Sequence, residues 1–517
     1  MGRAEERSVA AIALATGASR IFGLVRDMLL FALLGLSPWN GIFVFAFTVP
    51  NLFRRLLGEG ALASAMLPLF SETLVRDSRE RAFAFLNQIL TRLAVALGLL
   101  LLVAALAFLS LRQFLDPHWE LALRFTVLLS PYLPLTCLCA MLCGALNGLG
   151  SFGWPALTSL WLNCSLLLAA ALGLWLVPGD AAGATLLLCA GVLAGGCVQL
   201  AFPWILLRRR LWKFRWIWPS STLLLRLWHL FLPALLGAAV VQVNAAISRL
   251  LAFSLTGNGI STLYLASRLV ELPLGVFSIS IATVAFTDLA RLAASGDRAA
   301  FGERYRSACR SIAMVTVPAM LGLFLLGRPI LTLFFRWGHY GASELEQTIP
   351  VLCASALGIP SYALSALAVR AFHARQDMAT PLRIALVSVV ANLILTVVLA
   401  RRCAATGIAL AGVASSLIQW VLLEWRARAF LGPLVPSRFW MTFSKLLLAN
   451  GFLAFLLLAI GRWIPFAIPP RPAALLQLSL SLPLGFAGYF FLLRRVHFDE
   501  VSLFSTFFSH FFRRRSR

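Results

Sequence analysis

The chain has 517 residues, of which 60% are hydrophobic and only 12% are charged, and its formal net charge is +24. Apolar runs of about 20 residues recur along it, which excludes an ordinary soluble protein, and the alternating pattern of a membrane barrel is absent. The sequence therefore predicts an all-α polytopic membrane protein. The basic residues cluster between the apolar runs, so topology signals and contacts with anionic lipid account for most of them better than nucleic acid does.

Hydropathy predicts about 14 transmembrane helices. The first six cover residues 8–34, 41–71, 83–111, 121–147, 154–177 and 183–207. The next six cover residues 223–254, 262–290, 310–333, 348–373, 381–400 and 404–424, and the last two cover 441–462 and 472–493. Lys and Arg concentrate on alternate connections and on both tails, so the positive-inside rule predicts that both termini are cytoplasmic.

An approximate internal repeat predicts two lobes. Residues 145–168 and 370–395 each carry a Pro at the opening of a helix (Pro155, Pro381) followed by an Asn (Asn163, Asn392). We expect six-helix lobes at 1–207 and 223–430, related by a pseudo-two-fold axis along the membrane normal, as in transporters built from parallel repeats. The basic, Trp-rich segment 208–222 is the expected interfacial linker and hinge.

Two further segments follow the second lobe. Residues 431–495 hold the last two predicted spans. Residues 496–517, rich in Phe and ending in arginines, are too short and too charged to span, and we expect them to lie on the inner leaflet.

Ionisable residues at membrane depth mark the candidate site, because each costs roughly 2.5 to 3.5 kcal/mol unless it faces a partner or a wet cavity. The predicted set contains five cations and three acids: Arg20, Arg26, Arg54, Arg55, Arg268, Asp27, Glu59 and Glu271. Spacings of four and three residues allow Arg55–Glu59 and Arg268–Glu271 to pair on one helix face, in a structural role as readily as a functional one.

The remaining arginines are harder to balance locally. Asp27 is adjacent to Arg26 in sequence, and we expect its side chain to point elsewhere; Arg20 and Arg54 have no acid at three or four residues. A cavity with excess guanidinium favours an anion, and phosphate matches the planar fork of Arg.

Helix breakers accompany these charges. Pro50, Gly58 and Gly60 are expected to loosen the second span, and Pro273 with Gly275 the eighth. Broken helices near a binding site recur in transporters, although Gly and Pro are common in membrane helices in general.

Four segments, taken together, resemble signatures of the MurJ (MviN) family, the lipid II flippases of bacterial peptidoglycan synthesis, within the multidrug, oligosaccharidyl-lipid and polysaccharide exporter superfamily. The segments are SRIFGLVRD, FAFTVPNLFRRLLGEGALASAMLP, LASRLVELPLGVFSISIAT and FHARQDMATPLRIA. The resemblance extends over nearly the whole chain in order and span count.

The resemblance implies a multi-pass protein of the bacterial cytoplasmic (inner) membrane that serves cell wall biogenesis and cell shape. It would flip lipid II to the outer leaflet by alternating access, with a cationic central cavity for the pyrophosphate headgroup and a groove for the lipid tail at spans 13 and 14. The implied substrate-binding residues are Arg20, Arg26, Asp27, Arg54, Glu59 and Arg268. Secondary candidates are Arg55, Glu271, Asn51 and Asp377, although a helix-start role before Pro381 suits Asp377 better than catalysis.

The sequence departs from the family pattern at one acidic position. Gly41 stands nine residues before Pro50, where the family has an Asp. No acid lies between residues 223 and 254, so sodium coupling is not supported. We expect no cofactor and no metal, and the membrane potential, worth about 2.3 kcal/mol per charge per 100 mV, is the expected driving force.

Three other functions are compatible with parts of this pattern. A flippase for another polyprenyl-linked oligosaccharide shares every feature above, whereas drug exporters of the superfamily rely on membrane carboxylates and aromatic pockets. A membrane enzyme acting on the same lipid lacks an acid pair or metal cluster in the loops, and buried arginines argue against a scaffold. We therefore expect a transporter, not an enzyme, whose partners are lipid II, membrane lipids and the cell-wall synthesis machinery.

Overall fold

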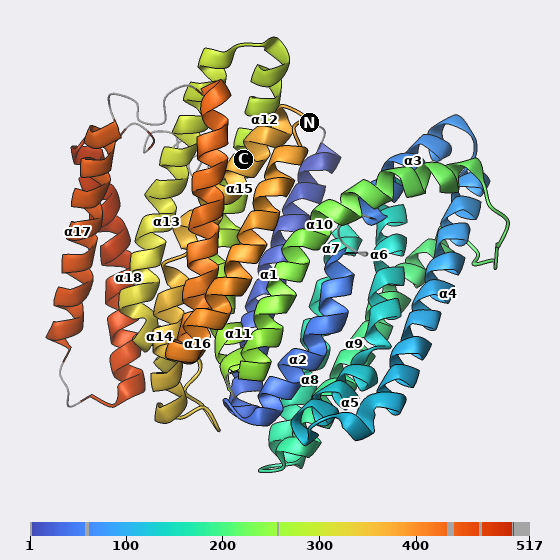
Figure 1. Ribbon diagram of the computed structural model, residues 1–517, viewed down its shortest axis with the longest axis horizontal. Helices are drawn as coiled ribbons and strands as arrows, with labels where there is room; N and C mark the ends of the chain where they lie inside the picture. The colour runs from blue at the N-terminus through green and yellow to red at the C-terminus, as the bar shows by residue number, and fades with distance from the viewer. Residues whose placement is uncertain are drawn as a thin grey trace. The chain divides into compact units, whose positions relative to one another are not determined.

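The computed structural model describes residues 3–56, 62–151, 153–255, 258–431, 439–464, 468–498 and 500. Every regular element in these ranges is helical (Figure 1). Contacts divide the chain into two compact units, Met1–Ser261 with Trp337–Tyr340, and Thr262–Arg336 with Gly341–Arg517. The first division falls within a helix, α11.

The first unit contains the helices of the amino-terminal half. They are α1 (Arg3–Leu34), α2 (Pro38–Phe53), α3 (Leu62–Arg76), α4 (Arg79–Leu111), η2 (Arg112–Phe114), α5 (Pro117–Leu129), α6 (Tyr132–Gly148), α7 (Gly153–Ala156), α8 (Thr158–Leu176), α9 (Ala181–Arg209) and α10 (Thr222–Leu255). Helix α10 belongs here through its contacts with α2, α3 and α4.

The second unit contains the remaining helices. They are α11 (Gly259–Pro273), the π-helical segment η3 (Leu274–Ser278), α12 (Ile279–Ser295), α13 (Arg298–Phe334), α14 (Ala342–Ala356), α15 (Ile359–Ala374), α16 (Ala379–Leu431), α17 (Phe439–Trp463) and α18 (Pro470–Arg495). The predicted division into lobes, linker and tail remains a prediction, and residues 501–517 of the tail lie outside the described residues.

The predicted all-α membrane class is confirmed, because the described residues contain nine helices long and apolar enough to cross a membrane. A helix overlaps each predicted span, although the count of 14 spans remains a prediction. Several spans predicted as one run are broken: residues 121–147 become α5 and α6, and residues 348–373 become α14 and α15. The spans predicted at 381–400 and 404–424 form the two arms of α16, in which the chain turns back at Cys403 and Ala404, so that Ser388 Oγ donates to the Ser415 carbonyl (2.9 Å).

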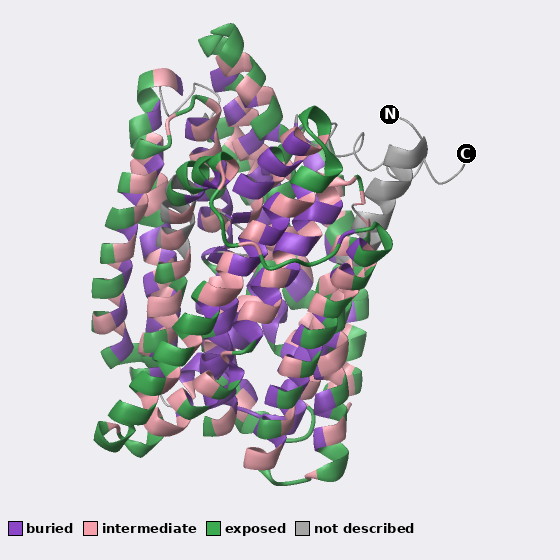
Figure 2. Cartoon of the chain, turned by 90° about the vertical axis from the view of Figure 1, so that its right-hand side faces the viewer, coloured by how far each residue is buried: buried purple, intermediate pink, exposed green. Residues whose placement is uncertain are grey.

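Helix α4 shows why such a chain needs lipid. Its outward side chains Leu99, Leu102, Val103, Leu106 and Leu109 are each more than half exposed. Figure 2 shows the same division along the helices, with buried residues on the packed faces and exposed ones on the outer faces. In water a continuous apolar surface of this kind would be unfavourable, whereas hydrocarbon tails cover it at no cost.

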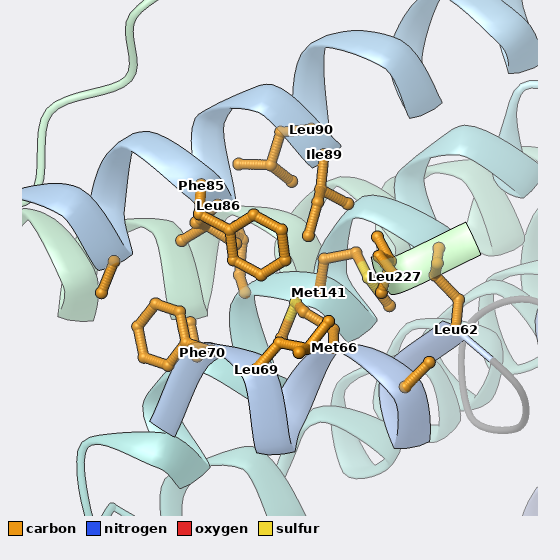
Figure 3. Close-up of a cluster of buried hydrophobic side chains, with 14 of the residues drawn as sticks. Leu62, Met66, Leu69, Phe70, Phe85, Leu86, Ile89, Leu90, Met141 and Leu227 are labelled. Atoms are coloured by element: carbon orange, nitrogen blue, oxygen red, sulfur yellow. The ribbon is translucent and has the colours of Figure 1, made fainter. Parts of the chain in front are cut away.

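The core of the first unit is an apolar cluster between α3, α4, α6 and α10 (Figure 3). Met66 and Phe70 of α3 are fully buried in it. They face Gly144 and Gly148 of α6, where a Cβ atom would come within 2.7 Å of the Met66 methyl carbon and the Phe70 ring, respectively. This spacing of two glycines four residues apart lets the helices approach closely, as in membrane helix pairs.

The predicted interfacial linker lies along α4. Trp212 is fully buried and donates its indole N–H to Asn87 Oδ1 (3.0 Å), while Asn87 Nδ2 donates to the Lys213 carbonyl (3.0 Å). One turn further along α4, Thr91 Oγ1 accepts the Ile217 N–H (3.3 Å). These bonds tie the linker to α4 of its own unit, an attachment that a free hinge would lack.

In the second unit α17 and α18 pack on α13. Leu453 and Leu457 of α17 share a buried cluster with Leu478 of α18 and Met314 of α13. The Tyr489 hydroxyl donates to the Met314 carbonyl (2.8 Å), which satisfies both groups inside the apolar cluster. The last two predicted spans are therefore attached to the unit by side-chain packing as well as by the chain.

We predict that Trp212→Ala destabilises the protein strongly, by about 3 to 5 kcal/mol, because it leaves a cavity beside Trp204 and removes the partner of Asn87. Thermal unfolding in detergent measures the effect. Trp216→Ala is the matched control, since Trp216 lies in the same linker but is 61% exposed. Equal loss of stability in the two variants would show that the linker is not held by its buried indole.

Candidate functional site

Two π-helical segments interrupt helices close to the candidate cations. Residues 54–56, directly after α2, adopt π geometry, and so does η3 directly after Pro273 of α11. The eighth predicted span is interrupted at Pro273 and Gly275, as expected. In the second span, Pro50 lies inside α2 without ending it. Gly58, Glu59 and Gly60 lie outside the described residues. Such π segments frequently occur at functional sites, because they displace side chains from the regular helical register.

Arg26 and Asp27 of α1 form a buried ion pair. Asp27 Oδ1 accepts from Arg26 Nη2 at 2.7 Å and from Nε at 3.0 Å, and the two residues are only 8% and 3% exposed. The prediction that Asp27 points away from Arg26 is therefore wrong. The long Arg side chain folds back along α1 to its neighbour, since the low-dielectric surroundings favour a charge partner.

Asn163 of α8 completes the environment of Arg26. Its Oδ1 accepts from Arg26 Nη1 (2.9 Å), and its Nδ2 donates to the Ser19 carbonyl (3.0 Å). In the sequence Asn163 marks only the internal repeat, and this role was not predicted. The available signal was an amide inside an apolar span, where it needs a polar partner.

Arg54 is oriented by an amide of α2. Asn51 Oδ1 accepts from Arg54 Nε (3.0 Å) and Nη2 (2.9 Å), three residues back along the chain. Asn51 is buried and Arg54 half-buried. These two hydrogen bonds fix the direction of the Arg54 guanidinium. Arg55 is also half-buried, and its predicted pairing with Glu59 remains a prediction.

In the second unit the predicted Arg268–Glu271 pair is confirmed. Arg268 Nη1 donates to Glu271 Oε2 (3.1 Å), and Nη2 donates to the Tyr264 hydroxyl (3.2 Å). The guanidinium also lies 4.9 Å from the centre of the Tyr264 ring, within the range of a cation–π contact. Glu271 is exposed and Arg268 is half-buried, so this pair is less enclosed than Arg26–Asp27.

Asp377 has the helix-start role that the sequence indicates. Its Oδ1 accepts the Thr380 N–H (3.0 Å) at the beginning of α16. Burial opposes ionisation of this carboxyl, but hydrogen bonds from Thr380 and the nearby charge of Arg375 outweigh it and lower its pKa. Its contacts serve the helix end.

The structure also explains why an acid is missing at the start of α2. A Cβ atom on Gly41 would lie 3.3 Å from Ile260 Cγ2 and 3.8 Å from Ser261 Oγ, both on fully buried residues. The neighbouring Asn40 is fully buried and donates its Nδ2 to the Gly35 carbonyl. A carboxylate at position 41 would begin in close contact with the Ile260 side chain.

One cation at depth was missed altogether. Arg249 lies in α10, half-buried, and donates Nη1 to Thr48 Oγ1 of α2 (3.3 Å). The available signal was an Arg deep inside the predicted span 223–254, whose other Arg, Arg226, lies near its start. Five arginines and one acid therefore lie in two segments of the first unit, residues 17–56 and 235–255. The arginines are Arg20, Arg26, Arg54, Arg55 and Arg249, and the acid is Asp27.

The chain matches one protein family, described as lipid II flippase MurJ, over residues 30–469. It is 30% identical to a probable lipid II flippase MurJ of Vibrio cholerae serotype O1 over 494 residues, covering 91% of this chain and 92% of the relative. It is 33% identical to a protein of the same name from Bdellovibrio bacteriovorus, covering 81% of each chain.

Solved structures show the same fold. A lipid II flippase MurJ in an inward closed conformation superposes with a TM-score of 0.78 at 24% identity, covering 94% of this chain and 99% of the other. An inward-facing multidrug resistance MATE transporter of the MOP superfamily superposes with a TM-score of 0.63 at 13% identity, covering 81% and 96%.

We predict that Asp27→Ala destabilises the protein by about 3 to 5 kcal/mol, because it leaves the guanidinium of Arg26 buried without its acid. The double variant Arg26→Gln with Asp27→Ala should lose less, which a thermal-unfolding mutant cycle measures. Asp77→Ala is the control, since it breaks the exposed Asp77–Arg81 pair (3.3 Å), and exposed pairs contribute under about 1 kcal/mol. Equal effects of Asp27→Ala and Asp77→Ala would contradict the prediction.

Proposed function

The chain belongs to the MurJ family of lipid II flippases, and we propose that it moves the lipid-linked peptidoglycan precursor lipid II from the cytoplasmic to the outer leaflet of the bacterial inner membrane. The precursor carries a pyrophosphate between its polyprenyl tail and its sugar-peptide headgroup. Transport makes and breaks no covalent bond, so the proposed protein is a carrier.

The observation that carries the proposal is the excess of guanidinium over carboxylate in the first unit. Arg54 is oriented by the amide of Asn51. Arg26 is paired with Asp27 and oriented by Asn163. A guanidinium group at membrane depth costs several kcal/mol, and binding of an anionic phosphate among several of them offsets part of that cost.

In the proposed mechanism a cationic cavity opens to one side of the membrane at a time. The anionic headgroup binds the arginines, including Arg20 and Arg268, and stabilises the closed state, which is a ligand-driven population shift. The lipid tail stays in the bilayer, along a groove that we assign to α17 and α18. This scheme includes the two six-helix lobes, the 14 spans and the cytoplasmic termini of the sequence prediction.

The proposed energy source is the membrane potential, with no cofactor and without sodium coupling. The positively charged empty carrier would be drawn to the negative cytoplasmic side, by about 2.3 kcal/mol per charge per 100 mV. The packing at Gly41 supports a mechanism without a carboxylate at the start of α2, since Ile260 and Ser261 occupy the space beside it. Membrane lipids and the cell-wall synthesis machinery are the other proposed partners.

We predict that Arg54→Gln abolishes transport while leaving the fold intact, because the half-buried site accepts a shorter polar side chain but loses the positive charge that binds phosphate. The measurement is complementation of a host depleted of this protein, followed by assay of the leaflet in which lipid II accumulates. Arg112→Gln is the control, an exposed arginine of η2. A folded Arg54→Gln protein that supports normal lipid II export would contradict the proposal.

A further inference from the structure

The connection between α13 and α14 contains a segment that belongs to the first unit. Residues Trp337–Tyr340 cluster with that unit, whereas α13 and α14, on either side of them, cluster with the second. We call Trp337–Tyr340 the strap. Its partner within the first unit is the carboxyl end of α1 with the residue that follows it, residues 31–35. The strap is therefore a piece of the first unit that is joined at both ends to helices of the second.

Backbone contact holds the strap on α1. The His339 N–H donates to the Ala32 carbonyl (2.9 Å). Gly338 has a φ of +53°, and a Cβ atom there would lie 2.2 Å from the Ala32 carbonyl oxygen. Gly35, directly after α1, has a φ of +56°, and a Cβ atom there would lie 2.5 Å from the His339 carbonyl oxygen. Both sides of the contact need glycine, because the backbone is left-handed and no space remains for a side chain.

One side chain of the strap is buried beside α1. Tyr340 is 1% exposed, and its ring meets the fully buried ring of Phe31 edge to face, with centres 5.8 Å apart. The other strap residues, Trp337, Gly338 and His339, are exposed. An attachment made by so short a segment, with a single buried side chain, can break while each unit stays folded.

The chain on both sides of the strap is held within the second unit. Arg328 of α13 donates Nη1 to Glu346 Oε1 (2.6 Å) and Nη2 to Glu346 Oε2 (2.9 Å), which links α13 to α14. Directly after the strap, the Glu344 carboxylate accepts the Gly341 N–H (2.9 Å). Because α13 and α14 are linked to each other, a movement of this pair against α1 has to be taken up at the strap.

The predicted topology places this contact on the outer side of the membrane. With both termini cytoplasmic, the connection after the first span and the connection after the ninth both lie outside. Contact between them agrees with that topology, since segments on opposite sides of a bilayer cannot touch. In the proposed function the outer side has to open to release the headgroup, so a contact there has to form and break in every transport cycle.

We propose that the strap is a latch on the outer side of the carrier. Bound to α1, it holds the outer side closed, and its release from α1 accompanies outward opening. Phe31 lies four residues after Asp27, so a substrate that binds at Arg26 and Asp27 acts on the same helix that the latch holds. This inference rests on the proposed function and deepens it, because it names the element that controls access to the outer side.

The first test locks the strap on α1. Ala32→Cys with His339→Cys, in the full-length chain with its nine native cysteines replaced by alanine, is joined by a short, cleavable thiol cross-linker. Export of lipid II by the protein in liposomes should fall roughly tenfold or more on cross-linking and recover on cleavage, because an opening step is blocked. Arg328→Cys with Glu346→Cys is the matched control. It joins α13 to α14 on the same side of the membrane within one unit, so its cross-link should leave export unchanged.

The second test loosens the strap and needs no substrate. Gly338→Ala places a Cβ atom against the Ala32 carbonyl, so hydrogen exchange at the His339 N–H in nanodiscs should become roughly tenfold faster. Gly296→Ala is the control, since Gly296 has a φ of +76° and open space around its Cβ position. It carries the same backbone strain without the contact, and exchange at His339 should not change. Thermal unfolding checks that both variants are folded.

The outcomes separate the latch from the proposed function. Normal export by the cross-linked Ala32→Cys/His339→Cys protein would disprove the latch and leave the proposed function standing. Equal loss of export in the cross-linked Arg328→Cys/Glu346→Cys control would also overturn the latch, because the effect would not belong to the strap. If the chain without these substitutions exports no lipid II, the proposed function is wrong. Unchanged exchange at His339 in folded Gly338→Ala would disprove the latch whatever the cargo.

Discussion

The free-energy cost of holding a guanidinium group among apolar helices is the constraint on which this structure depends. Arg26 and Arg268 each have a carboxylate within 3.1 Å, which removes net charge from the apolar region. Asn51 and Thr48 accept hydrogen bonds from Arg54 and Arg249, and these bonds fix the direction of each guanidinium. Both kinds of contact depend on polar groups that the helices place beside the arginines.

The fold supplies the rigidity that such contacts require. The glycines of α6 allow α3 to pack closely against it, and hydrogen bonds hold the linker on α4. The ring of Phe253 stacks on Phe45, which fixes α10 on α2. Rigid neighbours keep a polar group aimed in the absence of ligand, which reduces the entropy lost when an anion binds. The π segments after α2 and after Pro273 place irregular backbone beside the charged residues, where transporters commonly break their helices.

The fold does not by itself identify a cargo. A MATE transporter shares the arrangement of helices at 13% identity. The charged residues bear on the cargo instead, since an arginine-rich set suits a phosphate. The close packing around Gly41 extends the same point, because the shape of the site removes a carboxylate as well as the sequence does.

The sequence by itself determined the helical membrane class, the family, and the contacts that obey helix spacing. Arg268–Glu271 and the capping role of Asp377 are local, so intervals of three residues were sufficient to predict them. Tertiary structure alone decided the partners of Arg26 and Arg249. Asn163 is 137 residues from Arg26 and Thr48 is 201 residues from Arg249, and no periodicity relates them. Even the adjacent Arg26–Asp27 pair was misjudged, because the burial that bends the arginine toward its neighbour comes from the packing of α8 on α1.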